Sequence, residues 1–456
     1  MGSELSGRIP GEVYLRGDPR AHSEVSGFNT RVIHDPDLVV CPGSTGDVVE
    51  TVRFARERRL RIHVLSTGHG ATVPIRSGLV VSMRRLTGLE IDPSRRVVKM
   101  GGGTRWGAVV AEAGKFGLAP VAGASGTVGA VGLLVGGGLG PLARSHGFSS
   151  DGWRRATVVD GSGERIDASK ESAPELLWAL RGGGEPPGIV TELEVRLAEL
   201  PTLFGGSLVF AEKDIPGAFR GWLEWTRTAH PRLTTSAAIA RFPTDAGPPP
   251  FRGKRILHLR FAYPGPAGEG ERLATPLRRL GPVVMDDIRE MPPTDIARIH
   301  GDPTEPTPTW FTGTMLARVD DALATRVLAE VGPGSAGPFS MAEIRHLGEQ
   351  TLRDVPEGSA VGGRSGLYTL SLLAMHPGPV LAELPVAARR FHAALGPWRA
   401  PETNVNFVGE SLAPEIVPRC WPPEIAARLA EIRRRHDSGP FGTAAAGDAP
   451  GTTSGR

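Results

Sequence analysis

The sequence predicts an α+β protein in which a mixed α/β region comes first and a second α+β region follows. Short apolar strands alternate with helical segments up to about residue 200, which is typical of a mixed α/β domain. After Pro201 the segments become longer, which indicates a separate unit. The length of 456 residues also favours two or three packed units over a single core.

The first half of the chain is expected to contain short helices and strands that are separated by clear capping and turn residues. We expect residues 1–30 to form a loop or irregular lead-in. After a strand at 38–41, Ser44, Thr45 and Asp47 can cap a helix that runs to Arg58. The later elements expected here are strands at 61–65 and 78–82, a hairpin of 89–91 and 97–100, a helix at 106–114 ending in glycine, a hairpin of 156–159 and 164–167, a helix at 176–180 and a strand at 189–197.

The second half is expected to carry longer elements and a separate C-terminal part. These elements are helices at 214–229, 318–331 and 423–435, strands at 254–263, 312–317 and 339–345, and a short apolar segment at 404–407. The patterns divide the chain into residues 1–200, 201–400 and 401–437, with a Gly/Ala/Ser/Thr tail at 438–456 that we expect to be disordered.

The overall charge and the cysteines argue against several classes of protein. The 52 basic and 49 acidic side chains give a net charge of +3, and the basic residues are scattered, so we expect no nucleic-acid partner. Cys41 and Cys420 have no metal-ligand spacing and make no disulfide framework, so we expect no metal site. No signal-peptide stretch begins the chain, and no run approaches the roughly 20 apolar residues of a membrane span. We therefore expect a cytoplasmic protein without a membrane partner.

Residues 123–140 form an unusually dense glycine block. Eight of these eighteen positions are glycine, and they are interleaved with apolar residues such as Val128, Val131 and Leu134. A flexible linker would be polar, so the pattern favours a folded segment whose backbone lies close to a bulky ligand. The block does not have the strand–GxGxxG–helix order of a Rossmann unit, so it does not indicate NAD.

Two further motifs support a ligand site in the same half. Ser66-Thr67-Gly68-His69-Gly70 follows the strand at 61–65, and its glycines allow the loop to present His69 on a ligand. Arg181-Gly182-Gly183-Gly184 precedes the strand at 189–197.

The order of these motifs closely resembles the FAD-binding domain of the vanillyl-alcohol-oxidase superfamily, in its berberine-bridge-enzyme-like branch. The resemblance runs from about Asp37 to Leu200 and continues more weakly to Phe441. It implies a two-part FAD-binding domain of mixed α/β subdomains at 1–200 and a substrate-binding domain at 201–400, with an antiparallel sheet covered by helices. The segment at 401–437 would return to the FAD domain.

The resemblance also implies which residues hold the flavin. The expected cofactor-binding residues come from the Gly-His loop, the glycine block, the strand at 189–197 and the C-terminal segment: Ser66, Thr67, Gly68, His69, Gly70, Gly123, Ser125, Thr127, Val128, Gly129, Gly132, Gly136, Gly137, Gly138, Gly140, Gly188, Ile189, Val190 and Asn406.

In such proteins the histidine at the position of His69 typically bonds covalently to the flavin 8α-methyl carbon. A second bond, made by a cysteine in some members, falls here on Ser125, so we expect a single attachment. Val128 stands where the family places a small residue beside the flavin, as in its oxygen-reactive members, and this favours an oxidase over a dehydrogenase.

The chain departs from the family pattern at two places. Glu185-Pro186-Pro187-Gly188 replaces Gly-Asn-Phe-Gly, and the two prolines stiffen the turn and remove N–H donors. Asn404-Val405-Asn406-Phe407 replaces Tyr-x-Asn-Tyr, so Asn406 is retained while both tyrosines, one of which often serves as base, are absent.

The catalytic base therefore has to come from other residues. The strand around 339–347 carries Glu343 and His346, which we expect on opposite faces, so both cannot meet the flavin. We take Glu343, His346 and Asn406 as the catalytic candidates, while ion pairing and core packing are the competing roles for the first two. The other candidates are the loop pair His300 and Asp302, with Trp310, Phe311 and Tyr368 as residues that could line the pocket.

These observations predict an FAD-dependent oxidase. It would remove a hydride from a small organic substrate, such as an alcohol, an amine or a secondary-metabolite intermediate, and reduce O2 to H2O2. Two alternatives stay open: a non-redox cyclase or isomerase on the same fold, and a drug-binding resistance protein. The sequence leaves the substrate and the oligomeric state unknown.

Overall fold

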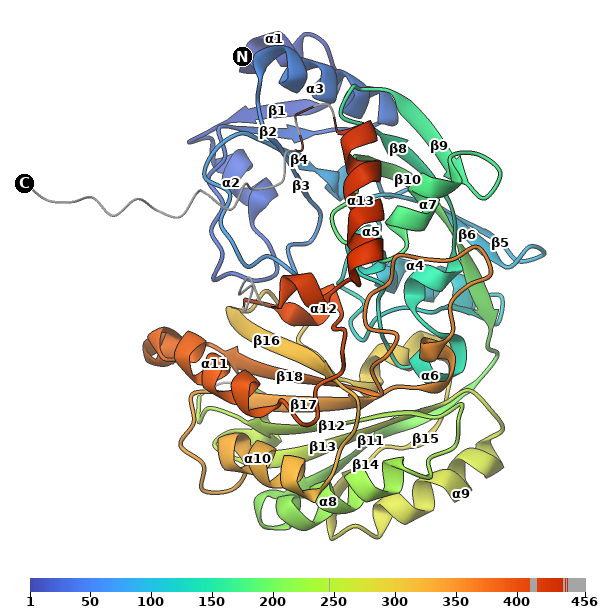
Figure 1. Ribbon diagram of the computed structural model, residues 1–456, viewed down its shortest axis with the longest axis vertical. Helices are drawn as coiled ribbons and strands as arrows, with labels where there is room; N and C mark the ends of the chain where they lie inside the picture. The colour runs from blue at the N-terminus through green and yellow to red at the C-terminus, as the bar shows by residue number, and fades with distance from the viewer. Residues whose placement is uncertain (246, 411–415, 438, 440, 442–456) are drawn as a thin grey trace, which may run out of the picture.

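The computed structural model describes residues 1–245, 247–410, 416–437, 439 and 441, and three sheets form its framework (Figure 1). The first sheet has the order β1-β2-β4-β3, in which the last three strands are parallel and β1 is antiparallel to β2. Its strands are β1 (Glu12–Leu15), β2 (Leu38–Cys41), β3 (Ile62–Leu65) and β4 (Leu79–Ser82). The helix α3 (Thr45–Arg58) is preceded by Ser44, whose side chain accepts a hydrogen bond from the Asp47 amide, as expected for an N-cap.

The expectation of an irregular N-terminal lead-in is wrong. Residues 2–25 form α1 (Gly2–Ser6), β1 and α2 (Pro19–Val25). Leu5 and Ile9 are buried in the same core as β2 and α3, and Tyr14 and Val25 are buried in an adjoining one. Each of these elements is only four to seven residues long, which is too short for an apolar period to be recognised in a polar stretch.

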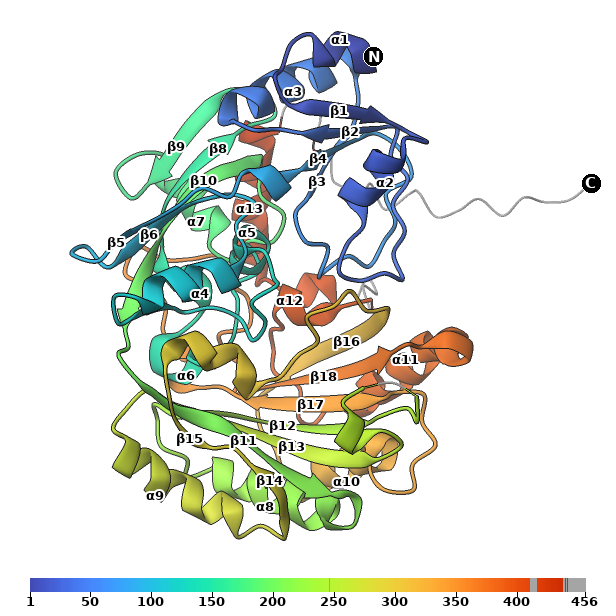
Figure 2. The same ribbon diagram turned by 180° about the vertical axis from the view of Figure 1, so that it is seen from behind.

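The second sheet is antiparallel and has the order β5-β6-β10-β8-β9, with β7 paired to β10. Its strands are β5 (Leu89–Asp92), β6 (Val97–Gly101), β7 (Leu118–Pro120), β8 (Trp153–Val159), β9 (Arg165–Ser169) and β10 (Ile189–Glu199). The helices that accompany it are α4 (Trp106–Gly114), α5 (Ala130–Leu134), α6 (Ala143–His146) and α7 (Pro174–Leu180). Seen from behind, α6 lies against the third sheet (Figure 2).

The third sheet is antiparallel and has the order β14-β11-β13-β12-β17-β18-β16, with β15 paired to β11. Its strands are β11 (Leu203–Ala211), β12 (Thr234–Arg241), β13 (Arg255–Tyr263), β14 (Val283–Asp286), β15 (Arg289–Met291), β16 (Thr309–Leu316), β17 (Met341–His346) and β18 (Tyr368–Met375). The helices α8 (Ile215–Thr226), α9 (Ala267–Arg278), α10 (Asp321–Val331) and α11 (Leu384–Ala394) cover the face turned away from the first two sheets (Figure 1).

The C-terminal segment lies against the upper half of the molecule again (Figure 1). The apolar stretch at 404–407 is the short helix α12 (Val405–Val408), and α13 (Pro423–His436) packs beside α7. The Arg428 guanidinium lies 3.8 Å from the centre of the Trp178 ring. The tail predicted to be disordered lies outside the described residues, apart from Gly439 and a buried Phe441.

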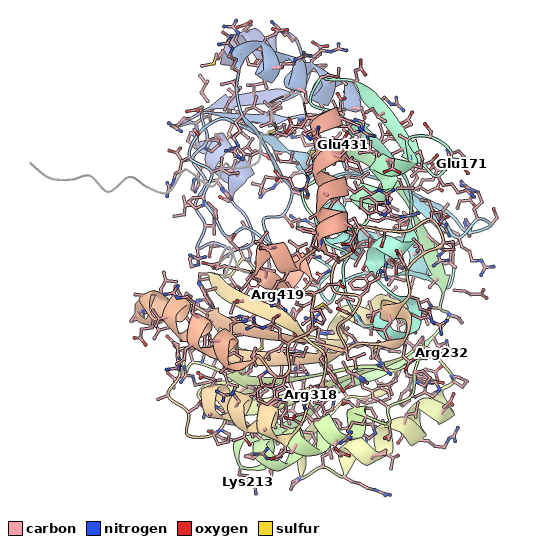
Figure 3. All side chains as sticks on the ribbon, viewed as in Figure 1. Glu171, Lys213, Arg232, Arg318, Arg419 and Glu431 are labelled. Atoms are coloured by element: carbon pink, nitrogen blue, oxygen red, sulfur yellow. The ribbon has the colours of Figure 1, made fainter. Side chains whose placement is uncertain are left out.

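The predicted α+β fold class is confirmed: mixed α/β layers adjoin an antiparallel sheet covered by helices. Charged side chains of both signs project from both halves, among them Glu171 and Lys213 (Figure 3). No helix in the described ranges is long and apolar enough to cross a bilayer.

Candidate active site

Two adjoining cavities lie between the upper half of the molecule and the open face of the third sheet. The first, of about 490 Å³, is lined mainly by the loop after β3 and by the glycine block. The second, of about 300 Å³, is lined by the glycine block, by β16–β18 and by the loop at 302–309. The residues common to both cavities are His69, Val128, Leu133, Phe311 and Asn406.

The loop after β3 is shaped for close contact with a ligand. Gly68 has a φ of +68°, and a Cβ there would lie 2.6 Å from the Gly27 Cα, so only glycine fits. Ser66 lines the first cavity, and its buried hydroxyl has no hydrogen-bond partner among the described residues. A buried hydroxyl without a protein partner is suited to an acceptor such as a cofactor phosphate.

The glycines of the block have two different roles. A Cβ on Gly132 would meet no atom within 4 Å, so this glycine opens onto the first cavity. A Cβ on Gly136 would overlap the side-chain amide of Asn406, and one on Gly140 would overlap the Ala122 carbonyl. Gly137 and Gly138 have φ values of +101° and +78°. One set of glycines therefore makes room for a ligand, and the other lets the backbone pack tightly.

His69 lies at the boundary of the two cavities and is held in a defined orientation. Its Nε2 is 2.8 Å from the Thr127 hydroxyl, which is in turn 2.9 Å from the Ser125 hydroxyl. The Phe28 ring stacks on the imidazole at a centroid distance of 3.7 Å. Burial, with the nearby Arg105 charge, lowers the pKa of His69 to about 4, so the imidazole is neutral at neutral pH.

Asn406 also belongs to both cavities. Its side-chain nitrogen donates to the Leu133 carbonyl at 3.0 Å, while its backbone N–H donates to the Asn404 side chain at 3.1 Å. The short helix α12 therefore places an amide group against the glycine block. This contact explains why Gly136 has to lack a side chain.

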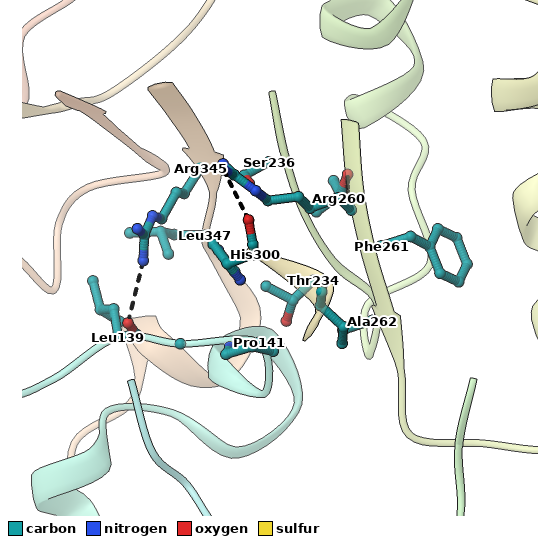
Figure 4. A pocket seen from close by; sticks show the side chains of 13 residues that line it. Leu139, Pro141, Thr234, Ser236, Arg260, Phe261, Ala262, His300, Arg345 and Leu347 are labelled. Atoms are coloured by element: carbon teal, nitrogen blue, oxygen red, sulfur yellow. Dashed lines mark hydrogen bonds between the residues drawn. The ribbon is translucent and has the colours of Figure 1, made fainter. Parts of the chain in front are cut away.

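Glu343 is the centre of a buried ion-pair cluster rather than a free carboxylate. Its Oε1 accepts from Arg260 Nη1 at 2.6 Å, and its Oε2 accepts from Arg345 Nε and Nη2 at 2.9 and 2.8 Å. Burial alone would raise the pKa of Glu343, but Arg345 and Arg260 outweigh it and hold the pKa well below its usual range. Figure 4 shows two further bonds of the arginines, from Arg260 to the His300 carbonyl at 3.3 Å and from Arg345 to the Leu139 carbonyl at 3.5 Å.

Asp302 lines the same cavity as Glu343, but the pKa of its carboxyl is shifted in the opposite direction. It is half-buried and makes no ion pair within the described ranges, and burial raises the pKa of its carboxyl despite the more distant Arg260 and Arg345. Its neighbour His300 is buried beside a hole of about 10 Å³, roughly the size of one water molecule. Neither ring nitrogen of His300 has a hydrogen-bond partner in the described chain.

His346 lies on the opposite face of β17, away from both cavities. Its Nε2 is 3.0 Å from Nη1 of the buried Arg144, and its ring stacks on Tyr368 at a centroid distance of 4.9 Å. Burial, followed by the Arg144 charge, lowers the pKa of His346 to about 2. The candidate role of His346 as a catalytic residue therefore has no geometric support, because the alternation of strand faces separates it from Glu343.

The remaining predicted residues fall into three groups. Phe311 lines both cavities, whereas Trp310 and Tyr368 are buried in the core of the third sheet. Gly123 and Ser125 line the second cavity. Gly188, Ile189 and Val190 pack on β8 and line neither cavity of the described structure.

Sequence reasoning missed Phe28 and Arg260. Phe28 lies in the stretch expected to be an irregular lead-in, and its backbone N–H donates to the Thr67 carbonyl at 2.8 Å. Arg260 lies on β13, two strands away from β17 in the sheet. A charged residue inside an apolar strand was the only signal available for it.

The residues present fit a bound FAD. The first cavity combines the buried Ser66 hydroxyl, which has no partner among the described residues, with Gly132, which opens onto free space, and with the neutral His69 at its boundary with the second cavity. Residues 36–169 also match the model of the family described as an FAD binding domain. The protein is therefore an FAD-dependent oxidoreductase, and it is similar to the berberine-bridge-enzyme-like proteins of the vanillyl-alcohol-oxidase (PCMH-type) flavoprotein superfamily.

Individual relatives extend this similarity over nearly the whole chain. The (R)-6-hydroxynicotine oxidase of Paenarthrobacter nicotinovorans is 28% identical over 442 residues, which is 94% of each chain. The crystal structure of 6-hydroxy-D-nicotine oxidase from Arthrobacter nicotinovorans has a TM-score of 0.79 at 26% identity, covering 94% of this chain and 95% of that one. The BBE-like 1 protein of Physcomitrella patens shares the fold, with a TM-score of 0.82 at 16% identity and 97% coverage of both chains.

Proposed function

We propose that the protein is an FAD-dependent oxidase that oxidises a small organic substrate in the second cavity and passes the electrons to O2, giving H2O2. The observation that carries this proposal is the meeting of two cavities at His69, Val128 and Asn406. Bound FAD supplies an acceptor for a hydride and a site at which O2 is reduced. Val128 lines both cavities at this boundary, at the position where the oxygen-reactive members that the sequence resembles place a small residue, and this supports an oxidase.

His69 is the proposed point of covalent attachment, and no second attachment is expected at Ser125. A neutral imidazole has a free electron pair for bond formation, and Thr127 fixes its orientation through Nε2. In the linked form a ring nitrogen of His69 would replace one hydrogen of the 8α-methyl group. The two protons released, one from the methyl group and one from the imidazole, would go with two electrons to O2 and give H2O2. Ser66, Thr67 and the backbone around Gly129 to Gly132 would hold the phosphate-bearing part of the cofactor.

Asp302 is the proposed catalytic base in place of Glu343. A base has to accept a proton near neutral pH, and both oxygens of Glu343 are occupied by arginines that stabilise its ionised form. Asp302 lines the cavity without an ion pair of its own in the described structure, and its raised pKa makes it the better acceptor. Asn406 would orient the reacting groups through its amide rather than transfer a proton.

The test of the cofactor proposal is the visible spectrum of the purified, FAD-loaded protein before and after acid precipitation. We expect yellow colour that stays in the pellet, and a His69→Ala variant that releases it to the supernatant. A His22→Ala variant, which changes an exposed histidine, should behave like the wild type. Colour in the wild-type supernatant would refute the covalent bond, and a protein that cannot be loaded with FAD would refute the oxidase.

A further inference from the structure

The charged end of the second cavity contains more cationic groups than the ion-pair cluster can neutralise. Of the described residues that line it, only His69, Arg260, Asp302, Glu343 and Arg345 are ionisable. His69 is neutral at neutral pH, since burial lowers its pKa. Arg260 and Arg345 share one carboxylate, Glu343, and Asp302 forms an ion pair with neither of them within the described ranges. One guanidinium charge is therefore without a contacting counterion.

Arg345 is the guanidinium that reaches the cavity. Its side chain is 18% exposed, whereas those of Arg260 and Glu343 are each 6% exposed. Nε and Nη2 of Arg345 are occupied by Glu343, but among the described residues Nη1 has only the 3.5 Å bond to the Leu139 carbonyl (Figure 4). That distance is at the long limit of a hydrogen bond, so Nη1 can donate to a ligand in the cavity.

The rest of the wall on the side of the third sheet is mainly apolar. Its apolar members are Phe311 on β16, Met341 on β17, Leu373 and Met375 on β18, and Phe407 on α12. Its two polar members, Thr307 and Thr309, already donate their hydroxyl hydrogens to the Glu305 and Thr307 carbonyls. A sugar placed here would lose the hydration of its hydroxyl groups without gaining enough partners. An ammonium group would be repelled by the guanidinium charge that Glu343 does not neutralise.

We infer that the substrate of this site is a small apolar molecule that carries a carboxylate group, and that Arg345 is the residue that binds this group through Nη1. The apolar part of the substrate would lie against Phe311, Met341 and Leu373. This inference rests on the proposed function only in taking the second cavity as the substrate site. It makes Arg345 a specificity-determining residue, while Asp302 keeps the role of base.

The experiment uses three probes of one shape and different charge: benzoate, benzamide and benzylamine. Each is titrated into the FAD-loaded protein, and binding is measured both by the change in flavin absorbance and by calorimetry. We expect benzoate to bind about tenfold to hundredfold more tightly than benzamide, as is usual for a hydrogen bond to a charged group. Benzylamine should bind most weakly.

Two variants of Arg345 test the residue itself. Arg345→Gln should weaken benzoate binding by about tenfold or more and leave benzamide binding nearly unchanged, because only the anion contacts the lost charge. Arg345→Lys, which keeps the charge and the pairing with Glu343, should restore part of the benzoate affinity. The exposed Arg353→Gln variant is the matched control and should keep the wild-type affinities.

Three outcomes would overturn the inference. Equal affinities for benzoate and benzamide would show that the site does not select an anion. Tightest binding of benzylamine would assign the site to cations. An Arg345→Gln variant with altered flavin retention but wild-type benzoate affinity would assign Arg345 to the cofactor. Calorimetry needs no flavin signal, so a protein that binds benzoate through Arg345 but no FAD would refute the oxidase and not this inference.

Discussion

At the scale of single residues, two carboxyl groups in one cavity differ because their neighbours differ. Glu343 contacts two guanidinium groups and its pKa is lowered, whereas Asp302 has burial as its main influence and its pKa is raised. Carboxyl pairs whose environments separate their pKa values in this way commonly divide the roles of acid, base and electrostatic support. Glu343 is suited to support and Asp302 to proton transfer.

We predict that Asp302→Asn lowers kcat by about 10² to 10⁴ and leaves the flavin bound, because the amide cannot accept the proton. In the wild type, kcat/KM should rise with pH as Asp302 ionises, at a pH above the usual range of an aspartate because its pKa is raised. This acid limb should be lost in the variant. The measurement is the rate of H2O2 production as a function of pH, with any substrate that the enzyme is found to oxidise.

The exposed Glu305→Gln on the same loop is the control and should retain wild-type turnover. Wild-type kcat in Asp302→Asn would contradict the assignment of the base.

At the scale of elements, the glycine block combines open and tightly packed positions within a few residues. Gly132 belongs to α5 and opens onto the first cavity, while Gly136 contacts Asn406 just after the same helix. Neither has a positive φ, so the space around each Cβ decides the effect of a substitution. The two positions therefore form a matched pair.

We predict opposite results for alanine at these two glycines. Gly132→Ala should fold with nearly wild-type thermal stability but bind FAD more weakly, because the methyl group occupies space that the cofactor needs. Gly136→Ala should destabilise the fold by about 1–3 kcal/mol, as overpacking typically does, since Asn406 and α12 have to move. Thermal denaturation of the apoprotein and FAD titration separate the two effects. A Gly136→Ala variant with wild-type stability and FAD affinity would contradict the prediction, because it would show that α12 can shift to make room for the methyl group.

At the scale of the whole molecule, Arg144 connects the glycine-block side to the third sheet. It follows the block in α6 and donates through Nε to the Leu233 carbonyl at 2.8 Å and through Nη1 to the Leu347 carbonyl. Nη1 also lies 3.0 Å from His346 Nε2. Because arginine can only donate, His346 has to accept at Nε2 and is neutral.

We predict that the burial of His346 next to the Arg144 charge makes the stability of the fold sensitive to acid. The folded-state pKa of His346 is lowered to about 2, so below its ordinary value of 6.5 the unfolded chain binds a proton that the folded protein excludes. Stability should therefore be full above pH 6.5 and fall as the pH decreases, with up to about 1.4 kcal/mol per pH unit from this one group. His346→Gln should remove that part of the slope in denaturant unfolding between about pH 7 and pH 5.

His22→Gln serves as the control and should keep the wild-type slope. A His346→Gln variant with an unchanged slope would contradict the prediction.

The amino-acid sequence alone is enough to predict the class of protein and most of the elements. Helix α3 is predictable because its cap and apolar face lie within one short window, and α4 and β2 match their predicted ranges for the same reason. The glycine block and the Gly-His loop indicate FAD through their order along the chain, which needs no tertiary contact to be recognised. The period of two along a strand likewise places Glu343 and His346 on opposite faces.

Which of the charged residues act together depends on the tertiary structure. Arg260 and Glu343 are 83 residues apart in the chain and meet because β12 pairs with both β13 and β17. The same pairing turns Glu343 into a permanent anion and leaves Asp302 as the base candidate, because the pKa of a carboxyl depends on burial and on charges within a few ångströms. Composition and spacing report neither quantity, so the chemistry of the site follows from the placement of the strands.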